Sequence, residues 1–352
     1  MTAERPFPCG RSGRPTIKDV AAAAGVSRST VSRVLTGRGY AAHDVRERVL
    51  RAAAELGYVP DVAARLLKQQ VSRSIGVLVS DLRNPFYAEL AAGAGREARA
   101  RGYTMVLTDT GLSAEIEDEA AEALVALRVA GVIVTPNSPA VSGYLGSRGV
   151  SVVEVDRQFA AGTTDGVVAG NRVGARAATA HLTGLGHRRI ALVIDETEWT
   201  TGYERHQGYL EALHAADLKA DPDLVVTAGW DVADARRRAS DLLRRPDRPT
   251  AVFAANNVLA EGVWRAAGEL GLRVPADVSL VAFDDAPWMS MVSPPVSTVE
   301  QDAFHLGVAA VRRLDARIEL PEADSVTTVL GVRLLPRGST APPPPVLPPP
   351  PL

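Results

Sequence analysis

The stretch TIKDVAAAAGVSRSTVSRVL, residues 16–35, decides how the N-terminal part of the chain folds. Thr16 and Asp19 have the spacing of a capping box and predict that a helix begins directly after Thr16. Gly25 ends this helix, and Ser27 has the hydroxyl that caps a second one. Because two short helices joined by a tight turn are typical of a helix-turn-helix, we expect that motif here.

The apolar residues around this stretch are spaced for a small core. Val20, Val31 and Val34 can pack between the first two helices. Residues 44–56 have apolar side chains on one helical face, which predicts a third helix that Gly57 closes.

The second helix has polar side chains on its outward face. A recognition helix presents its N-terminal residues to base edges, so Arg28 and Ser29 are the first candidates for DNA contact. Arg33 lies one turn later and could bind guanine through two hydrogen bonds, with about 1–3 kcal/mol of discrimination. Outside this motif, each arginine would be interpreted as a solvated surface residue. The DNA-binding residues expected in this segment are Thr16, Ser27, Arg28, Ser29, Thr30, Ser32, Arg33 and Tyr58.

The net charge of −2 conceals an asymmetry along the chain. Residues 1–73 hold 13 Lys and Arg against 6 Asp and Glu, a net charge of +7, and the other residues have a net charge of −9. A basic segment on an acidic body is typical of a DNA-reading module joined to a second function. The alternative is a solvated charged tail.

From residue 74 onward, short β-branched runs alternate with longer amphipathic segments. This alternation predicts βαβ units and parallel sheets. About 265 residues are too many for one sheet of ordinary size, so we expect two lobes. The predicted strands cover residues 75–80, 104–109, 131–135, 150–155, 189–194, 223–228, 251–256 and 279–284.

Polar or aromatic residues end or follow these predicted strands. In open α/β sheets, ligands bind outside the carboxyl ends of the strands, so these residues are candidates for a ligand site. They are Asp81, Asp109, Asn137, Asp156, Asp195, Trp230, Asn256 and Asp284.

Several function classes are disfavoured by missing features. Cys9 is the single cysteine, so no intrachain disulfide can form. There is no apolar signal-peptide core and no apolar run near 18 residues, so we expect a cytoplasmic chain without a membrane span. His181 and His187 have no third metal ligand nearby, and we expect neither a metal nor a cofactor. There is no GxSxG, Walker or GxGxxG motif, so we expect no enzyme.

Three segments resemble the lactose-repressor (LacI/GalR) family and occur in that family's order. They are residues 16–35, ELGYVPDVAARLLK at 55–68 and IGVLVSDLRNPFYAEL at 75–90. The resemblance runs from about residue 16 to residue 340. It implies a small all-α helix-turn-helix head and an α/β, two-lobed, periplasmic-binding-protein-like body with parallel sheets. The expected domains are a disordered tail at 1–14, the DNA-binding domain at 15–59, a hinge helix and linker at 60–73, the effector-binding and dimerisation body at 74–340, and a proline-rich disordered tail at 341–352.

In that family, a hinge folds into a helix on operator DNA, and each hinge of a dimer inserts a leucine into the minor groove. Leu67 is the matching residue, and an apolar wedge of this kind unstacks a base step and kinks the duplex. Without the resemblance, the stretch would be an ordinary linker helix with Leu66 and Leu67 in a core. The hinge residues that the resemblance assigns to DNA are Ala64, Arg65, Leu67 and Lys68.

The resemblance also places an effector pocket between the two lobes. A sugar needs carboxylates and amides for its hydroxyls and an aromatic face for its C–H surface. The alternatives are that the aspartates are turn or capping residues and that the aromatics belong to the core. Arg157 is expected at the rim or as a bridge between the lobes. The implied effector residues are Asp81, Phe86, Tyr87, Asp156, Arg205, Trp230, Asn256 and Asp284.

Three places depart from the family's pattern. Residues 40–44 replace the usual start of the third helix, which affects its cap. Asn257 and Gly170 stand where the family usually has aspartate. Because both changes remove a carboxylate near the cleft, the hydroxyl pattern of the effector need not follow that of better-known members.

We therefore expect a homodimeric regulator, with repression as its leading mode, that binds palindromic double-stranded operator DNA. A small molecule, most simply a sugar, is expected to control its operator affinity allosterically. Two alternatives stay open: a regulator that needs its ligand as a corepressor, and a sugar-binding protein without a regulatory role.

Overall fold

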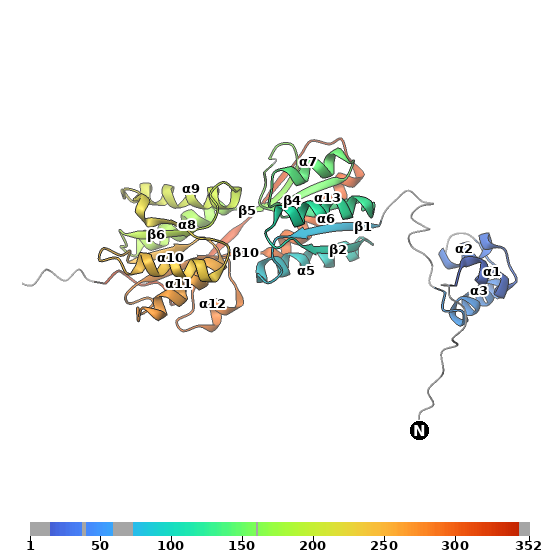
Figure 1. Ribbon diagram of the computed structural model, residues 1–352, viewed down its shortest axis with the longest axis horizontal. Helices are drawn as coiled ribbons and strands as arrows, with labels where there is room; N and C mark the ends of the chain where they lie inside the picture. Colours follow the sequence, from blue (N-terminus) through green and yellow to red (C-terminus); the bar gives the residue numbers. More distant parts are fainter. Residues whose placement is uncertain (1–14, 37–39, 59–72, 160, 345–352) are drawn as a thin grey trace, which may run out of the picture. The chain divides into compact units, whose positions relative to one another are not determined.

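The structure is a computed structural model that describes residues 15–36, 40–58, 73–159 and 161–344. The chain forms two compact units, Met1–Val71 and Ser72–Leu352 (Figure 1). None of the helices in the described ranges is long and apolar enough to span a bilayer.

Three helices build the first unit, as the sequence predicts: α1 (Ile17–Ala24), α2 (Arg28–Thr36) and α3 (His43–Glu55). At the start of α1, Thr16 N donates to Asp19 Oδ2 at 2.7 Å, which is the expected capping-box bond. Gly25 ends α1 in a left-handed conformation with a φ of 64°. Thr30 N donates to Ser27 Oγ at 3.2 Å and so caps α2.

A small apolar core holds these three helices together. Val20, Val31 and Val49 are fully buried, and Val34 is 4% exposed. The N-cap of α3 is Ala42, which has no side-chain oxygen to accept a helical N–H. The departure from the family at residues 40–44 therefore leaves α3 without a side-chain cap.

The second unit contains two lobes. The sheet of the N-terminal lobe has the order β11-β5-β4-β3-β1-β2, and all of its strand pairs are parallel. Its strands are β1 (Ser74–Val79), β2 (Thr104–Asp109), β3 (Gly131–Val134), β4 (Ser151–Asp156), β5 (Asp165–Ala169) and β11 (Thr327–Leu330). Its helices are α5 (Pro85–Ala100), α6 (Ala114–Ala126), α7 (Ala140–Ser147) and α13 (Ala303–Glu319).

The sheet of the C-terminal lobe has the equivalent order β12-β10-β9-β8-β6-β7. It is parallel except for the edge strand β12, which runs antiparallel to β10. Its strands are β6 (Ile190–Ile194), β7 (Val225–Thr227), β8 (Ala251–Ala254), β9 (Ser279–Phe283), β10 (Ser297–Gln301) and β12 (Val332–Leu335). Its helical segments are α8 (Asn171–Gly184), α9 (Thr200–Ala215), η1 (Pro222–Leu224), α10 (Val232–Leu243), α11 (Asn257–Glu269) and α12 (Pro287–Met291).

All eight predicted strands are present, and the two-lobed body with parallel sheets is confirmed. Four further strands, β5, β10, β11 and β12, were not predicted. The edge strands β11 and β12 have only four residues each, and they pair with β5 and β10, which were not predicted either. β10 begins with two buried polar residues, Ser297 and Thr298, which interrupt the apolar pattern.

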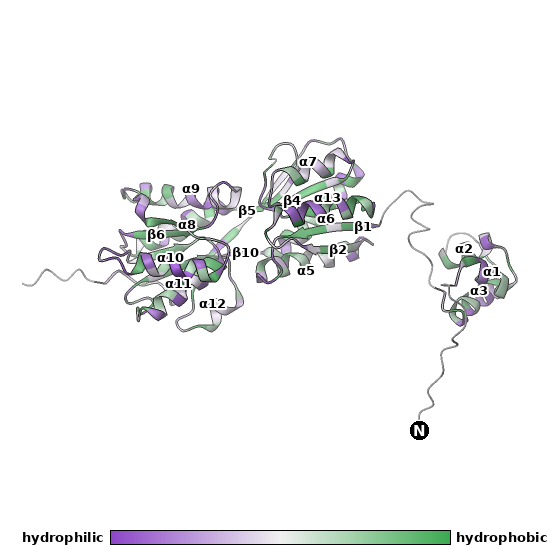
Figure 2. Cartoon of the chain, in the orientation of Figure 1, coloured by the Kyte–Doolittle hydropathy of each residue, from purple (hydrophilic) through white to green (hydrophobic). Residues whose placement is uncertain are grey.

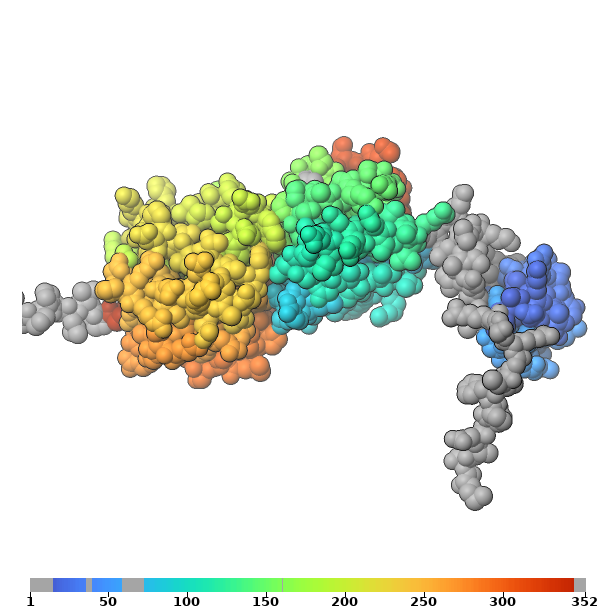
Figure 3. Space-filling model, viewed as in Figure 1, coloured from blue at the N-terminus to red at the C-terminus, as the bar shows by residue number. Residues whose placement is uncertain are grey.

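The chain crosses between the lobes three times. β5 leads into α8 through Gly170, β10 leads into α13 through Asp302, and β11 leads into β12 through Gly331. Residues near the C-terminus therefore lie on the N-terminal lobe, where Figure 3 shows red atoms beside green ones. Because of these crossings, neither lobe is a continuous segment of the chain.

The strands and the inner faces of the helices form the apolar cores of the two lobes. Figure 2 shows hydrophobic residues along the central strands and hydrophilic residues on the outer faces of the helices. In the C-terminal lobe, Phe253 and Phe283 are fully buried, and in the N-terminal lobe Ile133 and Leu90 are fully buried. Burial of such side chains is the main driving force for folding each lobe.

The end of the C-terminal lobe is held by buried polar contacts. Ala341 N donates to Ser279 Oγ at 3.1 Å, and His187 Nε2 lies 2.8 Å from Ala341 O. Ala341 is the first residue of the tail that we predicted to be disordered. The prediction is wrong for this residue, because its backbone is bonded to the body.

Gly262 permits the close packing of α11 on α10. A Cβ at this position would lie 2.4 Å from Ala235 Cβ and 2.7 Å from Arg236 N. Gly262→Ala is therefore expected to lower the free energy of unfolding by about 1–3 kcal/mol through overpacking. Gly268→Ala in the same helix has no atom within 4 Å of the new Cβ and should be neutral or slightly stabilising. Urea unfolding of both variants tests this, and equal unfolding midpoints would contradict it.

Candidate functional site

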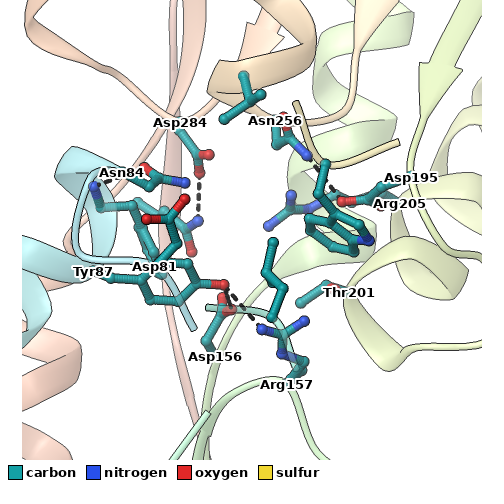
Figure 4. Close-up of a pocket in the computed structure, with 15 residues that line it drawn as sticks. Asp81, Asn84, Tyr87, Asp156, Arg157, Asp195, Thr201, Arg205, Asn256 and Asp284 are labelled. Atoms are coloured by element: carbon teal, nitrogen blue, oxygen red, sulfur yellow. Dashed lines mark hydrogen bonds between the residues drawn. The ribbon is translucent and has the colours of Figure 1, made fainter. Parts of the chain in front are cut away.

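The candidate ligand pocket lies between the two lobes, outside the carboxyl ends of both sheets (Figure 4). It is lined by all of the predicted effector residues, Asp81, Phe86, Tyr87, Asp156, Arg205, Trp230, Asn256 and Asp284. Seven further residues complete the lining: Asn84, Leu112, Arg157, Asp195, Thr201, Val258 and Gln301. The fold thus brings strand ends from both lobes to one polar cavity.

Asp156 and Asp284 occupy equivalent places in the two lobes. Asp156 ends β4 and Asp284 follows β9, and these strands hold the same position in their sheets. Both residues have left-handed backbones, with φ of 71° and 70°. Such a conformation costs on the order of 1–3 kcal/mol and is found mostly at functional sites. Each lobe therefore contributes a buried carboxylate on a strained strand end.

In the N-terminal lobe, Tyr87 connects Arg157 to Asp156. Arg157 Nη2 donates to the Tyr87 hydroxyl at 3.2 Å, and that hydroxyl donates to Asp156 Oδ2 at 3.2 Å. Arg157 Nη2 also donates to Ser80 Oγ. Of the two positions expected for Arg157, the rim is wrong, because Arg157 is 1% exposed and lines the pocket. The bridge between the lobes is confirmed, because its guanidinium lies on Trp199 of the other lobe. Both hydrogen bonds from Arg157 use Nη2 and lie within the N-terminal lobe, which holds the guanidinium at this deep position.

In the C-terminal lobe, Arg205 is fixed in one orientation. Its Nε donates to Asn171 Oδ1 at 2.8 Å and its Nη1 donates to Ala255 O at 2.6 Å. The guanidinium carbon lies 3.8 Å from the centroid of the Phe283 ring. Within the described residues these bonds use Nε and Nη1, so Nη2 is the donor left for a ligand.

Carboxylates and amides of the C-terminal lobe also line the pocket (Figure 4). Asn256 Nδ2 donates to Asp195 Oδ2 at 2.9 Å, while Asn256 Oδ1 accepts from Leu259 N at 2.8 Å and caps α11. Asn257 N donates to Asp284 Oδ2 at 3.2 Å. Asn256 therefore has a structural role and also lines the pocket.

Several residues that line the pocket also have a structural role, as turn residues or as part of the core. Asp81 accepts bonds from Arg83 N and Arg83 Nε, both at 2.9 Å, so it is a turn residue as well as a lining residue. Phe86 and Tyr87 are 8% and 6% exposed and pack in the N-terminal core. Trp230 lies against Trp199, with 4.8 Å between the ring centroids.

The structure separates the strand-end candidates into two groups. Asp195 lines the pocket, although we did not assign it to the effector. Asp109 instead accepts from Leu82 N and Gly111 N, and Asn137 donates through Nδ2 to Thr110 Oγ1, so these two residues shape loops. Its position after a strand makes Asp195 a ligand-site candidate in the sequence, and the structure places it in the pocket. No such pattern marks Gln301 or Thr201.

Burial governs the charges of the pocket. It raises the pKa of Asp195 to about 6, although Arg205 and the bond from Asn256 act in the opposite direction. It also raises the pKa of Asp156, against the attraction of Arg157 and Arg205. Burial of Asp81 acts in the same direction, but hydrogen bonds from Arg83 outweigh it and lower its pKa. Asp195 is thus ionised at neutral pH at a cost in stability.

That cost predicts how Asp195→Asn changes stability. The folded chain holds the Asp195 proton more tightly than the unfolded chain, so this stabilising contribution is complete below about pH 4 and is lost as the pH rises through about 6. Asp195→Asn should therefore raise the free energy of unfolding at pH 7.5 by about 1–3 kcal/mol and change little at pH 4. Urea unfolding at the two pH values is the measurement.

Asp277→Asn is the matched control, because hydrogen bonds from Arg273 lower the pKa of Asp277 to about 2. This variant should not gain stability at pH 7.5. An equal gain for Asp195→Asn at both pH values would contradict the burial argument.

Another candidate site is the outward face of α2 in the first unit. Arg28, Ser29, Ser32 and Arg33 are exposed there, as predicted from the sequence. Arg33 Nη1 lies 3.5 Å from the main-chain oxygen of Tyr40. This contact directs the Arg33 side chain toward the residues that precede α3.

The other residues predicted to contact DNA differ in their exposure and in their hydrogen bonds. Ser27 Oγ lies 2.7 Å from Ser29 Oγ and 2.9 Å from Thr30 Oγ1, so these hydroxyls form a cluster at the start of α2. Thr16 is exposed, and Tyr58 packs partly against the small core. The four predicted hinge contacts, Ala64, Arg65, Leu67 and Lys68, lie outside the described residues. Where the chain is described, no three His, Cys, Asp or Glu side chains are grouped so that they could hold a metal ion.

Comparisons with known proteins agree with both parts of the chain. Residues 16–61 match the family described as bacterial regulatory proteins, lacI family, and residues 179–340 match a periplasmic binding protein-like domain. The ribose operon repressor of Haemophilus influenzae is 32% identical over 316 residues, which are 90% of this chain and 95% of that protein.

Solved structures show the same architecture. The lac repressor dimer bound to operator and the anti-inducer ONPF aligns with a TM-score of 0.84 at 29% identity, over 94% of this chain and 100% of that one. The complex of the transcriptional regulator CelR with cellobiose aligns with a TM-score of 0.72 at 33% identity, over 93% and 100%. From its sequence relatives and its two units, the chain belongs to the lacI family of bacterial regulatory proteins and is a DNA-binding transcription regulator, not an enzyme.

Proposed function

We propose that the chain is a cytoplasmic, homodimeric repressor that binds palindromic operator DNA and releases it in response to a neutral sugar. The observation that carries the proposal is one chain with both an exposed polar recognition helix and a pocket between the lobes that is lined by carboxylates, amides, guanidiniums and an indole. The related proteins named as a ribose operon repressor and a regulator–cellobiose complex support the sugar class. The lac repressor dimer on its operator supports the dimer and the DNA partner.

The charges of the pocket favour a neutral polyol over an anionic ligand. Four lining residues are aspartates, Asp81, Asp156, Asp195 and Asp284, whereas two are arginines. Because each arginine already binds other groups, a phosphate would face an excess of negative charge. Sugar hydroxyls can donate to the carboxylates and accept from Arg205 Nη2, while Trp230 offers an apolar face.

The domain organisation gives the route from ligand to DNA. We assign 15–59 to DNA reading, 60–73 to a hinge that inserts Leu67 into the minor groove, and 74–340 to effector binding and dimerisation. Effector binding changes the angle between the lobes and thereby the spacing of the two hinges. By linkage, effector and operator alter each other's affinity by the same factor, typically about 5–150-fold.

Arg33 is proposed to read a base edge from α2. Arg33→Ala should flatten the base preference at one position of each half-site and cost about 1–3 kcal/mol on the preferred sequence. The measurement is selection of bound fragments from a random library at near-physiological salt. Arg51→Ala is the control, because Arg51 is exposed on α3 outside the recognition helix and should leave base preferences intact. Unchanged preferences in Arg33→Ala would move base reading to other residues.

Asp284 is proposed to accept hydrogen bonds from the effector. Asp284→Ala should keep operator affinity within about twofold and lose the 5–150-fold response to the sugar. The response is measured by operator binding with a panel of neutral sugars that includes D-ribose and cellobiose. Asp109→Ala removes a strand-end carboxylate outside the pocket and should respond normally. A normal response of Asp284→Ala to a sugar that releases the wild type would place the effector elsewhere.

A further inference from the structure

A stack of aromatic rings and a guanidinium joins the two lobes beside the pocket. Arg157 belongs to the N-terminal lobe, and its guanidinium carbon lies 4.0 Å from the ring centroid of Trp199 in the C-terminal lobe. The same carbon lies 5.7 Å from the centroid of Trp230, which packs against Trp199. Phe159 adds an edge-to-face contact to Trp199 at 6.3 Å. We call Arg157, Phe159, Trp199 and Trp230 the interlobe stack.

A hydrogen bond between the lobes continues the stack. Gln158 N donates to Thr200 Oγ1 at 2.9 Å, so two consecutive residues of one lobe contact two consecutive residues of the other. Across the pocket, Asn257 Nδ2 donates to Asn84 Oδ1 at 2.8 Å and provides another contact between the lobes. The pocket therefore has interlobe contacts on two sides.

The loop that holds Trp199 is closely packed by the helix that follows it. Trp199 is the N-cap of α9, and a Cβ at Gly202 in the first turn would lie 1.8 Å from Glu196 O. The turn thus folds tightly on the loop between β6 and α9. This packing holds the backbone of Trp199 in place beside Arg157.

The hydrogen bonds of Arg157 leave part of its guanidinium unpaired among the described residues. Its Nη2 donates to Tyr87 and Ser80, but Nε is buried and has no hydrogen-bond partner among the described residues. An unpaired buried donor costs about 1–3 kcal/mol, so other contacts must hold the guanidinium in this place. Because the guanidinium lies on an indole, its orientation is set by Trp199 together with Tyr87.

We infer that Trp199, which does not line the pocket, is a positioning residue that holds Arg157 against the C-terminal lobe and so sets the affinity for the effector. This inference rests on the proposed function in one respect, namely that the pocket binds a sugar. The stack holds the lobes together at the pocket, and because Arg157 also lines that pocket, an effector oxygen can accept from its guanidinium. Trp199 therefore links ligand binding to the relative position of the lobes.

The inference is tested without a ligand by hydrogen exchange of the full-length chain. In Trp199→Ala, amides of residues 156–159 and 199–203 should exchange about 2- to 30-fold faster, the range that corresponds to a cation–π contact. Trp199→Phe keeps an aromatic face and should restore most of the protection. Arg157→Lys keeps the charge but loses the flat guanidinium, and it should speed exchange in the same two segments. Unchanged exchange in Trp199→Ala and Arg157→Lys would overturn the inference.

Trp264→Phe is the matched control, because Trp264 pairs with Trp288 at 6.3 Å and neither ring lines the pocket. It should leave exchange in both segments unchanged. A general rise across the C-terminal lobe in Trp199→Ala, not reversed by Trp199→Phe, would show a merely structural role and also overturn the inference.

Binding of D-ribose and of cellobiose by equilibrium dialysis separates this inference from the proposed function. If either sugar binds the wild type, Trp199→Ala should weaken it by about 2- to 30-fold and Trp199→Phe by much less. If neither sugar binds, those two sugars fail as effectors, and the exchange experiment still decides the role of the stack. Equal sugar affinity in Trp199→Ala and the wild type would overturn the inference.

Discussion

The pocket depends on one topological constraint, the three crossings of the chain between the lobes at Gly170, Asp302 and Gly331. Each sheet receives its outer strand from a distant part of the sequence, and α13 returns to pack on α5. The carboxyl ends of both parallel sheets therefore meet at one cleft, where each sheet can supply ligand-binding residues. Three covalent links between the lobes keep the two sets of strand ends opposed.

This arrangement concentrates charge where water is largely excluded. Asp156, Asp195, Asp284, Arg157 and Arg205 are all less than 9% exposed. Such burial is tolerated because the groups bind one another or main-chain atoms, as Arg205 binds Ala255 O. The raised pKa of Asp195 shows that this compensation is incomplete. A sugar hydroxyl donating to this carboxylate would offset part of the remaining cost, so the pocket gains more from a polyol than an exposed site would.

The sequence predicted those parts of the fold that have regular local patterns. Thr16, Gly25 and Ser27 mark the ends of helices through bonds within a few residues, and the structure contains those bonds. β10 and the edge strands escaped prediction because their identity depends on pairing with distant segments, such as Val299 with Leu334. The bridging role expected for Arg157 is confirmed, but the rim alternative is wrong for the same reason. Its burial requires Ser80, Tyr87 and an indole from the other lobe, none of which is near it in sequence.

The division of the pocket between the lobes has a consequence for allostery. Asp156 and Tyr87 belong to one lobe, whereas Arg205 and Asp284 belong to the other, so a ligand that binds all four must favour one angle between the lobes. A ligand shifts a conformational equilibrium only by its difference in affinity for the two states. A molecule bound by one lobe alone would therefore bind without changing that angle. It follows that the span of the effector across the cleft, and not its affinity alone, determines how strongly it controls the DNA-binding unit.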